Sequence, residues 1–410
     1  MERNDFKYSL QLALIAATTV ISAFAAMPVF FYSNTYRLIL FSVWIIYFIT
    51  NIFLHKTSLT PVGIAIIISW ALYAAYCATM YLIHRDGYLN GTYFYSISLS
   101  VFIFINGCFL SHNKAKKVFD TITVIYNICS VIVVLYVYLT NFWSVEYFKV
   151  QTYIYGPKNS LGPIIVANLV ILAIREAGNK GLVKFARFCT IGFLVYILFL
   201  INNRAGIVEL AAVLLCYLLF SEKRPHIKLS GHQKKLAVLV ILVLGWILTM
   251  AIILQGQNII EKSSGFLKWA LKLDLINDLD KFSSGRISLY YLAIENAIKA
   301  SPLLGVGFWY TDFFYLSIIA EIGLIGFIPI SVIIFLIIAT AFKFIKSKET
   351  YPKLLGVLCI QMLTATFFEG LPPFGPGTVV FVFWLLFGAY AGSQSRAVGE
   401  MGSRKCIRDL

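Results

Sequence analysis

Positively charged residues occur in alternate gaps between a dozen apolar segments of this 410-residue chain. Apolar runs of about 17 to 25 residues are long enough to cross a bilayer as helices. About two thirds of the 34 Lys and Arg residues fall in the N-terminal tail, in every second loop and in the C-terminal tail. Because basic residues favour the cytoplasmic side, the pattern predicts an all-α polytopic membrane protein with about twelve spans and both termini in the cytoplasm. The predicted spans lie near 8–31, 36–54, 60–83, 93–111, 118–140, 159–174, 185–202, 204–220, 236–255, 312–342, 353–369 and 377–393.

The net charge of +15 follows mainly from this sorting and does not indicate nucleic-acid binding. The basic segment 221–228 and the basic tail 394–410 are expected beside the anionic inner leaflet, where each basic residue adds about 1 kcal/mol of attraction. Cysteines and histidines have no metal-ligand spacing, and the chain lacks a glycine-rich phosphate loop. We therefore expect a single membrane domain over 1–410 with no metal and no cofactor. Its energy source must be the substrate or an ion gradient.

The loop at 256–311 is the longest segment expected on the outer face, and a loop of that length is usually functional or disordered. Its last part, 286–300, has an apolar stripe at helical spacing, formed by Ile287, Tyr291, Ile294 and Ile298. Gly285 and the two serines before it offer an N-cap, and Ser301-Pro302 a stop. The sequence predicts an amphipathic helix that lies on the outer membrane surface or packs over the spans.

Ionisable residues at membrane depth are costly, so each one needs a reason. Arg204 stands at the outer end of a predicted span, with Glu209 deeper on the same helix. It has two interpretations: an arginine at a helix end that pairs inward with Glu209, or a cation that binds a phosphate. Asp312 and Glu321 bracket the start of the tenth span. Asp312 is either a plain carboxylate at a helix N-terminus or a general base.

The tenth span is longer than a bilayer requires. From Asp312 to Phe342 it would measure about 46 Å as a helix, against a hydrocarbon core of about 30 Å. Its first turns must therefore protrude, tilt or line a cavity. Gly323, Gly326 and Pro329 would permit a bend there.

Three stretches resemble the O-antigen ligases and Wzy-type polysaccharide polymerases. They are Tyr155-Gly-Pro-Lys-Asn-Ser-Leu-Gly162, Arg204-Ala-Gly206, and a block that runs from Gly285-Arg286 through Ser301-Pro-Leu-Leu-Gly-Val-Gly307 to Ala320-Glu-Ile-Gly-Leu-Ile-Gly326. The last block is the most specific, because its motifs occur in the family's order and spacing. The hydropathy pattern and the late outer loop are similar over almost the whole length, whereas the first 150 residues share only their hydrophobicity.

This resemblance implies a GT-C-like glycosyltransferase at the outer face of the bacterial inner membrane. The donor would be a growing glycan on undecaprenyl pyrophosphate, and the acceptor a second lipid-linked repeat unit. Arg204 and Arg286 would bind the pyrophosphate, and Asp312 would accept the proton of the attacking hydroxyl. The remaining residues would bind substrate or orient a neighbour: Asn203, Lys158, Asn159, Glu321 and Tyr315. For Lys158 and Asn159 the alternative is that they only cap the sixth span. A chain-length regulator would be a further partner.

Two other activities stay open. In the ligases the position of Asp312 is typically His followed by Asn, so Asp312-Phe313 favours a polymerase over an O-antigen ligase. A flippase or transporter of lipid-linked sugars would need charged or discontinuous helices near the membrane centre. Here the charges gather at one end of the predicted spans, which favours chemistry at one face.

Overall fold

The computed structural model describes residues 2–25, 27, 30, 33–54, 59–84, 87–89, 92–109, 115–141, 158–175, 181–201, 203–220, 285–375 and 378–392. Within these ranges the chain is helical and contains no strand. Every predicted span that falls in the described part is a helix. The predicted span at 236–255, most of the long loop and the basic tail 394–410 lie outside these ranges.

The helices follow the apolar segments closely. In chain order they are α1 (Glu2–Phe24), α3 (Asn34–Leu54), α4 (Pro61–His84), α5 (Thr92–Cys108), α6 (Ala115–Asn141), α8 (Lys158–Ile174), α9 (Gly181–Leu200), α10 (Arg204–Phe220), α14 (Arg286–Ala293), the π-helix η3 (Ile294–Ile298), α15 (Phe314–Phe344) and α16 (Thr350–Ala365), followed by a last helix, Thr378–Gly392.

Four helices in the described part are long and apolar enough to cross a membrane: Pro61–His84, Lys117–Leu139, Gly181–Leu200 and Phe314–Phe344. Several shorter apolar helices accompany them. Large apolar side chains are widely exposed, among them Phe53 (82%), Leu82 (78%) and Leu182 (80%). A surface this apolar would be a liability in water, and it suits contact with lipid. The chain is therefore an all-helical protein of the membrane-embedded type.

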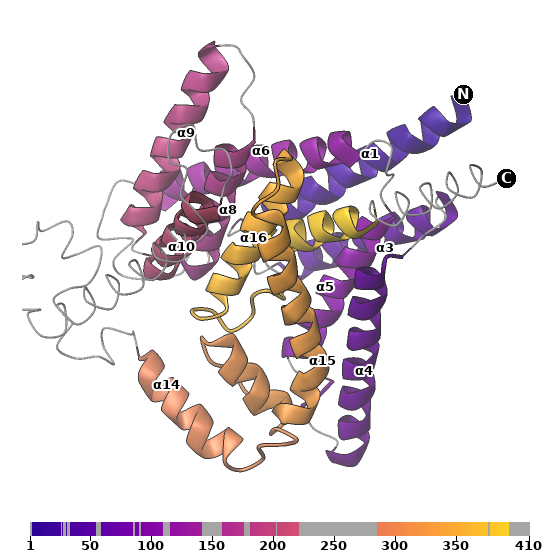
Figure 1. The fold of residues 1–410 in the computed structure, drawn as a ribbon, viewed down its shortest axis with the longest axis vertical. Coiled ribbons are helices and arrows are strands. Elements are labelled where there is room, and N and C mark those ends of the chain that lie inside the picture. The colour runs from indigo at the N-terminus through magenta and orange to yellow at the C-terminus, as the bar shows by residue number, and fades with distance from the viewer. Residues whose placement is uncertain are drawn as a thin grey trace, which may run out of the picture.

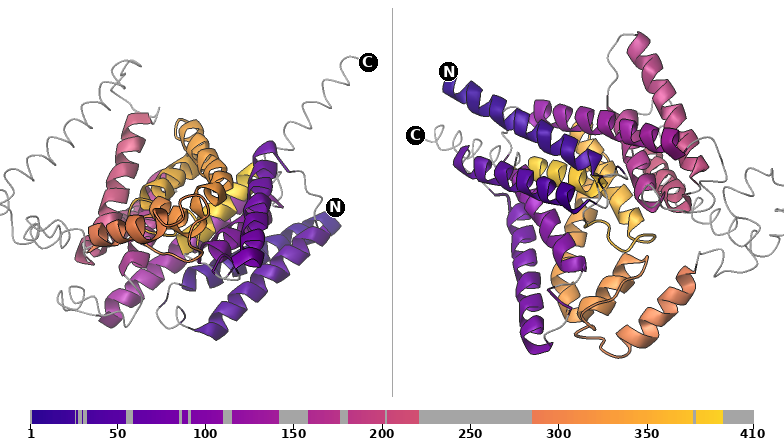
Figure 2. Two further views of the ribbon diagram at one scale, coloured as in Figure 1. Left: turned by 90° about the horizontal axis from the view of Figure 1, so that it is seen from below. Right: turned by 180° about the vertical axis from the view of Figure 1, so that it is seen from behind.

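Two groups of helices position the functional region. The helix α15 packs between α16 and α4, while α10 and α8 pack on the other side of α16. The helix α14 lies at the edge of the assembly, in contact with the first part of α15 (Figure 1). Figure 2 shows the same peripheral place for α14 from behind, and it shows α9 projecting from the rest of the molecule.

The helix α15 breaks at Gly323, whose φ of 68° and ψ of 179° are not helical. The strap, residues 301–307, runs through this break. Four backbone hydrogen bonds of 2.9 to 3.1 Å join the two, each from an N–H donor to a carbonyl acceptor: Val306 to Ala320, Gly307 to Glu321, Leu324 to Pro302 and Ile325 to Leu303. The strap thus partners backbone groups that the break would leave without a bond, which a buried site requires.

Glycines make this close approach possible. Gly305 and Gly323 both have positive φ, and a Cβ on either one would collide with the backbone of the other segment. The hydroxyl of Tyr76 on α4 donates to the Leu304 and Ile322 carbonyls at 2.8 Å, which fixes the strap from the side. The glycines of the sequence block around 301–326 are therefore packing positions of one unit.

The region from 286 to 314 differs from the sequence prediction in two boundaries and in the face that one helix buries. The helix α15 begins at Phe314, so Asp312 precedes the helix. The predicted helix at 286–300 is α14 followed by the π-turn η3, which ends at Ile298. Its predicted apolar stripe is mostly exposed, whereas Ala293 and Ala297 are buried, because only small side chains fit where the helix packs closely.

Candidate functional site

Arg286 lies between two carboxylates. Its Nε donates to Oδ2 of Asp312 at 3.1 Å, and its Nη2 lies 4.0 Å from Oε1 of Glu369. The three side chains come from the N-terminus of α14, the loop before α15 and the turn after α16. Arg286 is 19% exposed and Glu369 16%, so the cluster is largely withdrawn from solvent. We call these three residues the outer cluster.

Backbone contacts hold the two acidic segments together. The Phe314 N–H, directly after the Asp312 loop, donates to the Thr366 carbonyl at 3.0 Å. The Thr311 N–H donates to Oγ of Ser317 at 2.9 Å, and the Tyr93 hydroxyl donates to the Gly370 carbonyl. These contacts hold the segments that carry Asp312 and Glu369, and none of them involves Arg286.

The acids influence each other. Burial, and secondly the charge of Asp312, raise the pKa of Glu369 to about 7, although Arg286 acts in the opposite direction. Its Oε1 is buried and has no hydrogen-bond donor among the described residues. A charged carboxylate in such a place is costly. Tyr290 and Tyr310 are close enough to interact electrostatically with all three members of the cluster.

A second cation stands nearby. Arg204 begins α10 and lies within electrostatic range of Arg286. The residue before it, Asn203, caps this helix, since its Oδ1 accepts the Gly206 N–H at 2.7 Å. Asn203 is 2% exposed and packs against Gly162 of α8, where a Cβ would collide with its side chain. The three sequence stretches that carry the family resemblance thus meet at one end of the helices.

Glu209 lies deeper on α10 and is fully buried. It accepts a hydrogen bond from Nε2 of Gln361 at 3.3 Å, and it lies within electrostatic range of Glu369. Gln361 also donates to the Pro163 carbonyl at 2.9 Å. These polar contacts connect α8, α10 and α16 beneath the outer cluster.

The other predicted site residues have different surroundings. Glu321 is fully buried beside the strap: its backbone carbonyl accepts the Gly307 N–H, and neither carboxylate oxygen has a hydrogen-bond donor among the described residues. Tyr315 packs among aromatic rings, including Phe313 and Phe367. Lys158 and Asn159 form the first turn of α8, and their side chains lie outside the described residues.

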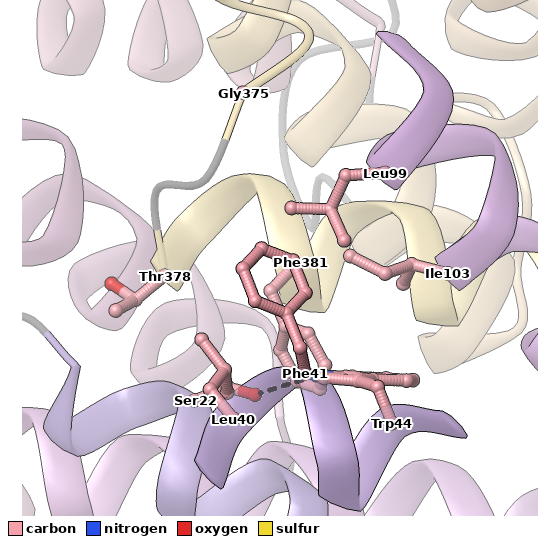
Figure 3. A pocket seen from close by; sticks show the side chains of 9 residues that line it. All are labelled: Ser22, Leu40, Phe41, Trp44, Leu99, Ile103, Gly375, Thr378 and Phe381. Atoms are coloured by element: carbon pink, nitrogen blue, oxygen red, sulfur yellow. Dashed lines mark hydrogen bonds between the residues drawn. The ribbon is translucent and has the colours of Figure 1, made fainter. Parts of the chain in front are cut away.

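The pocket drawn in Figure 3 has a different character. It is lined mainly by apolar side chains of α1, α3, α5 and the last helix, such as Leu40, Trp44 and Phe381. The Trp44 Nε1 donates to the Ser22 hydroxyl at 3.3 Å. None of its lining residues is ionisable, so this pocket offers no group for acid–base or phosphate chemistry.

Glu369 is the functional candidate that the sequence did not reveal. In the sequence, Glu369 stands at the end of the predicted span 353–369, before an apolar Gly- and Pro-rich turn, and this lone carboxylate was the available signal. Only the fold shows that this carboxylate faces Arg286, whose partner Asp312 comes from another loop. In the described part of the chain, no three His, Cys, Asp or Glu residues converge as a metal site would require.

The outer cluster can do two things chemically. Arg286, with Arg204 nearby, can hold an anionic group, preferably a phosphate, by charge-assisted hydrogen bonds. A carboxylate within reach of that group can accept a proton. Comparison with known proteins found no family model that matches the sequence and no matching curated protein.

Proposed function

We propose that this protein is a polysaccharide polymerase. It joins oligosaccharide repeat units carried on undecaprenyl pyrophosphate at the outer face of the bacterial inner membrane. The observation that carries the proposal is the outer cluster: a half-buried Arg286 with a second cation, Arg204, in range and a carboxylate at 3.1 Å. A transfer from a pyrophosphate donor needs cations that bind the leaving group and a carboxylate that accepts a proton.

The reaction is a single displacement. A sugar hydroxyl of the acceptor attacks the anomeric carbon of the donor, a new C–O bond forms, and the C–O bond to phosphate breaks with inversion. The electron pair leaves on undecaprenyl pyrophosphate, whose charge Arg204 and Arg286 stabilise. The hydroxyl proton goes to Asp312. No nucleotide is needed, because the sugar-phosphate bond supplies the energy.

The ion pair of Asp312 with Arg286 describes the protein without substrate. In this state the Arg286 Nε–H donor occupies Oδ2 of Asp312. When the pyrophosphate engages Arg286, it competes for the same N–H donors and frees Asp312 to accept a proton. The availability of the base is then coupled to donor binding.

The proposal includes the finer topology: twelve spans, cytoplasmic termini and a GT-C-like arrangement with the active site outside. One geometric observation supports it. Residues at the predicted outer ends of spans and in the outer loop contact each other in the outer cluster. Residues at predicted inner ends and in inner loops form a separate group, in which Nη2 of Arg175 lies 3.5 Å from Asp120 and the Tyr351 hydroxyl donates to the same carboxylate.

Electrophoresis of surface glycan tests the function. Cells that lack the gene are complemented with wild type, Asp312→Asn or, as a matched control, Asp120→Asn. A polymer ladder that collapses to a single repeat unit and is restored by wild type and Asp120→Asn, but not by Asp312→Asn, supports the polymerase. Full-length polymer left on its lipid carrier would indicate a ligase, and repeat units trapped on the inner leaflet a flippase.

A further inference from the structure

Among the described residues, acids gather closely around Arg286. It faces both Asp312 and Glu369, and the second cation, Arg204, lies within electrostatic range of Arg286. A doubly esterified pyrophosphate brings two negative charges at any pH near neutrality. If both acids stayed ionised, this anion would enter a half-buried site with an excess of negative charge, which low-dielectric surroundings make costly.

Glu369 is the acid that is least secured in its charged form. Its ion pair with Arg286 is 4.0 Å long, against 3.1 Å for Asp312, and its buried Oε1 has no hydrogen-bond donor among the described residues. It is also the less exposed of the two acids, at 16% against 29%. Geometry thus gives the two carboxylates different tasks.

We propose that Glu369 takes up a proton when the pyrophosphate of a lipid-linked glycan binds at Arg286. This inference rests on the proposed function, because it uses the phosphate-binding role of Arg286. The proton comes from the outer solution and no other bond changes. Glu369 becomes a neutral carboxylic acid that can donate a hydrogen bond, while Asp312 remains ionised and serves as the base. Glu369 is then a charge-balancing and positioning residue.

The surroundings of Glu369 favour this direction. An added anion stabilises the neutral form of a nearby carboxyl group, and the pKa of Glu369 already lies near 7. Glu209 of α10 contributes a further acid beneath it. Among the described residues, the other ionisable groups around the cluster are Arg204 on α10, Arg286 and Tyr290 on α14, Tyr310 and Asp312 in the loop before α15, and Tyr93 on α5.

Calorimetry of the full-length protein in detergent can count the proton. The probe is synthetic farnesyl-diphospho-N-acetylglucosamine, whose doubly esterified pyrophosphate keeps its charge between pH 6 and 9. Titrations at pH 7.5 in buffers of different ionisation enthalpy give the protons taken up per site. We expect at least about half a proton for wild type, from a carboxyl that starts mostly ionised.

Variants assign that proton. Glu369→Gln should bind the probe at least as tightly with no uptake, and its affinity should be independent of pH. Wild-type affinity should fall by up to about ten-fold per pH unit above pH 7, the limit for one linked proton. Asp312→Asn and the conservative Glu369→Asp should both retain uptake.

The outcomes separate the two proposals. If wild type does not bind the probe, or Arg286→Ala binds it equally well, the proposed phosphate site is wrong. If binding depends on Arg286 but wild type takes up no proton, or Asp312→Asn abolishes the uptake, the role of Glu369 is wrong while the proposed function stands. The phosphate site is tested by wild type and Arg286→Ala, and proton uptake by wild type, so neither test depends on the folding of a Glu369 variant.

Discussion

The protein has two charged clusters, and they are built differently. At the predicted inner end, Asp120 accepts from the Tyr351 hydroxyl and pairs with Arg175, and both charged side chains are more than a third exposed. At the predicted outer end, Arg286 is 19% exposed and faces two acids, one of which has a buried oxygen without a donor among the described residues. The inner cluster is a solvated link between helix ends. The outer cluster is withdrawn from water, and its charges are incompletely satisfied.

This difference separates a structural role from a functional one. Exposed ion pairs contribute little to stability, typically 0 to about 1 kcal/mol. Buried charges with incomplete partners cost free energy, and sites that bind or react are where such arrangements are maintained. On the proposed function, a ligand with two phosphates would satisfy Arg286 of the outer cluster and the nearby Arg204, whereas the inner cluster needs no ligand.

Arg286→Ala should give the largest effect. It removes the proposed phosphate-binding cation and leaves Asp312 and Glu369 facing each other, so we expect transfer to fall by about a thousand-fold, equivalent to about 4 kcal/mol. The rate is measured in membranes with a lipid-linked repeat unit, at equal protein levels by immunoblot. Arg286→Lys should recover little, because lysine lacks the two-pronged geometry of the guanidinium.

Arg175→Ala is the matched control at the inner cluster. Its ion pair is exposed and distant from the proposed chemistry, so transfer should stay within about two-fold of wild type. Equal losses from Arg175→Ala and Arg286→Ala would erase the functional contrast between the clusters.

Gly305→Ala should destabilise the outer region. Gly305 has a φ of 76°, and a Cβ there would collide with the backbone at Glu321 and Gly323. We expect the free energy of unfolding to fall by about 2 to 3 kcal/mol, measured as a lower unfolding temperature in detergent. The control is Gly192→Ala on α9, where a Cβ meets nothing within 4 Å and helix propensity improves. A Gly305→Ala protein as stable as this control would show that the strap does not need the close approach.

The helices could be predicted from the sequence because a lipid bilayer offers the backbone no hydrogen-bond partners. An apolar run in a bilayer must satisfy its own backbone hydrogen bonds, so length and hydropathy suffice to place segments such as 60–83 and 118–140. The bend near Gly323 was also predictable, since a helix from 312 to 342 exceeds the bilayer thickness. The strap that fills this bend was not, because its partners lie about twenty residues apart and meet only after folding.

The outer cluster could be predicted in part for a similar reason. Arg204, Arg286 and Asp312 stood out as charges in an apolar chain with a family-like spacing. Glu369 and the packing of Asn203 on Gly162 depend on which helices are neighbours, and local sequence does not encode that. Glu321 stood out as a charge beside a glycine motif, and the fold buries it beside the strap; its role as a substrate-binding or orienting residue stays a prediction.

Glu369→Gln should remove a pH dependence of the free energy of unfolding. In the unfolded chain this carboxyl ionises near its ordinary value of 4.5, whereas in the folded protein its pKa is about 7. Between these values the folded state binds more protons than the unfolded state, so wild-type stability falls as the pH rises from about 4.5 to 7. The variant lacks this loss and should gain up to about 3 kcal/mol over wild type at pH 8.

Thermal unfolding of both proteins at pH 5 and pH 8 measures this change. The difference between them should be small at pH 5 and larger at pH 8. A gain that is the same at both pH values would mean that the glutamine packs better, and that the charge of Glu369 is not the cause.

Tyr351→Phe should give the smallest effect and sharpens the comparison from the other side. It removes the hydroxyl that donates to Asp120 while Arg175 and water can still serve the carboxylate. We expect a loss of about 1 kcal/mol in the free energy of unfolding and an unchanged transfer rate. In 1 M salt, the loss of unfolding free energy caused by Tyr351→Phe should increase only slightly. Salt screens the ion pair of Arg175 with Asp120, but this pair is exposed and already weak. A large loss of transfer in this variant would mean that the inner cluster couples to the chemistry at the other end, and the two clusters would then be parts of one mechanism.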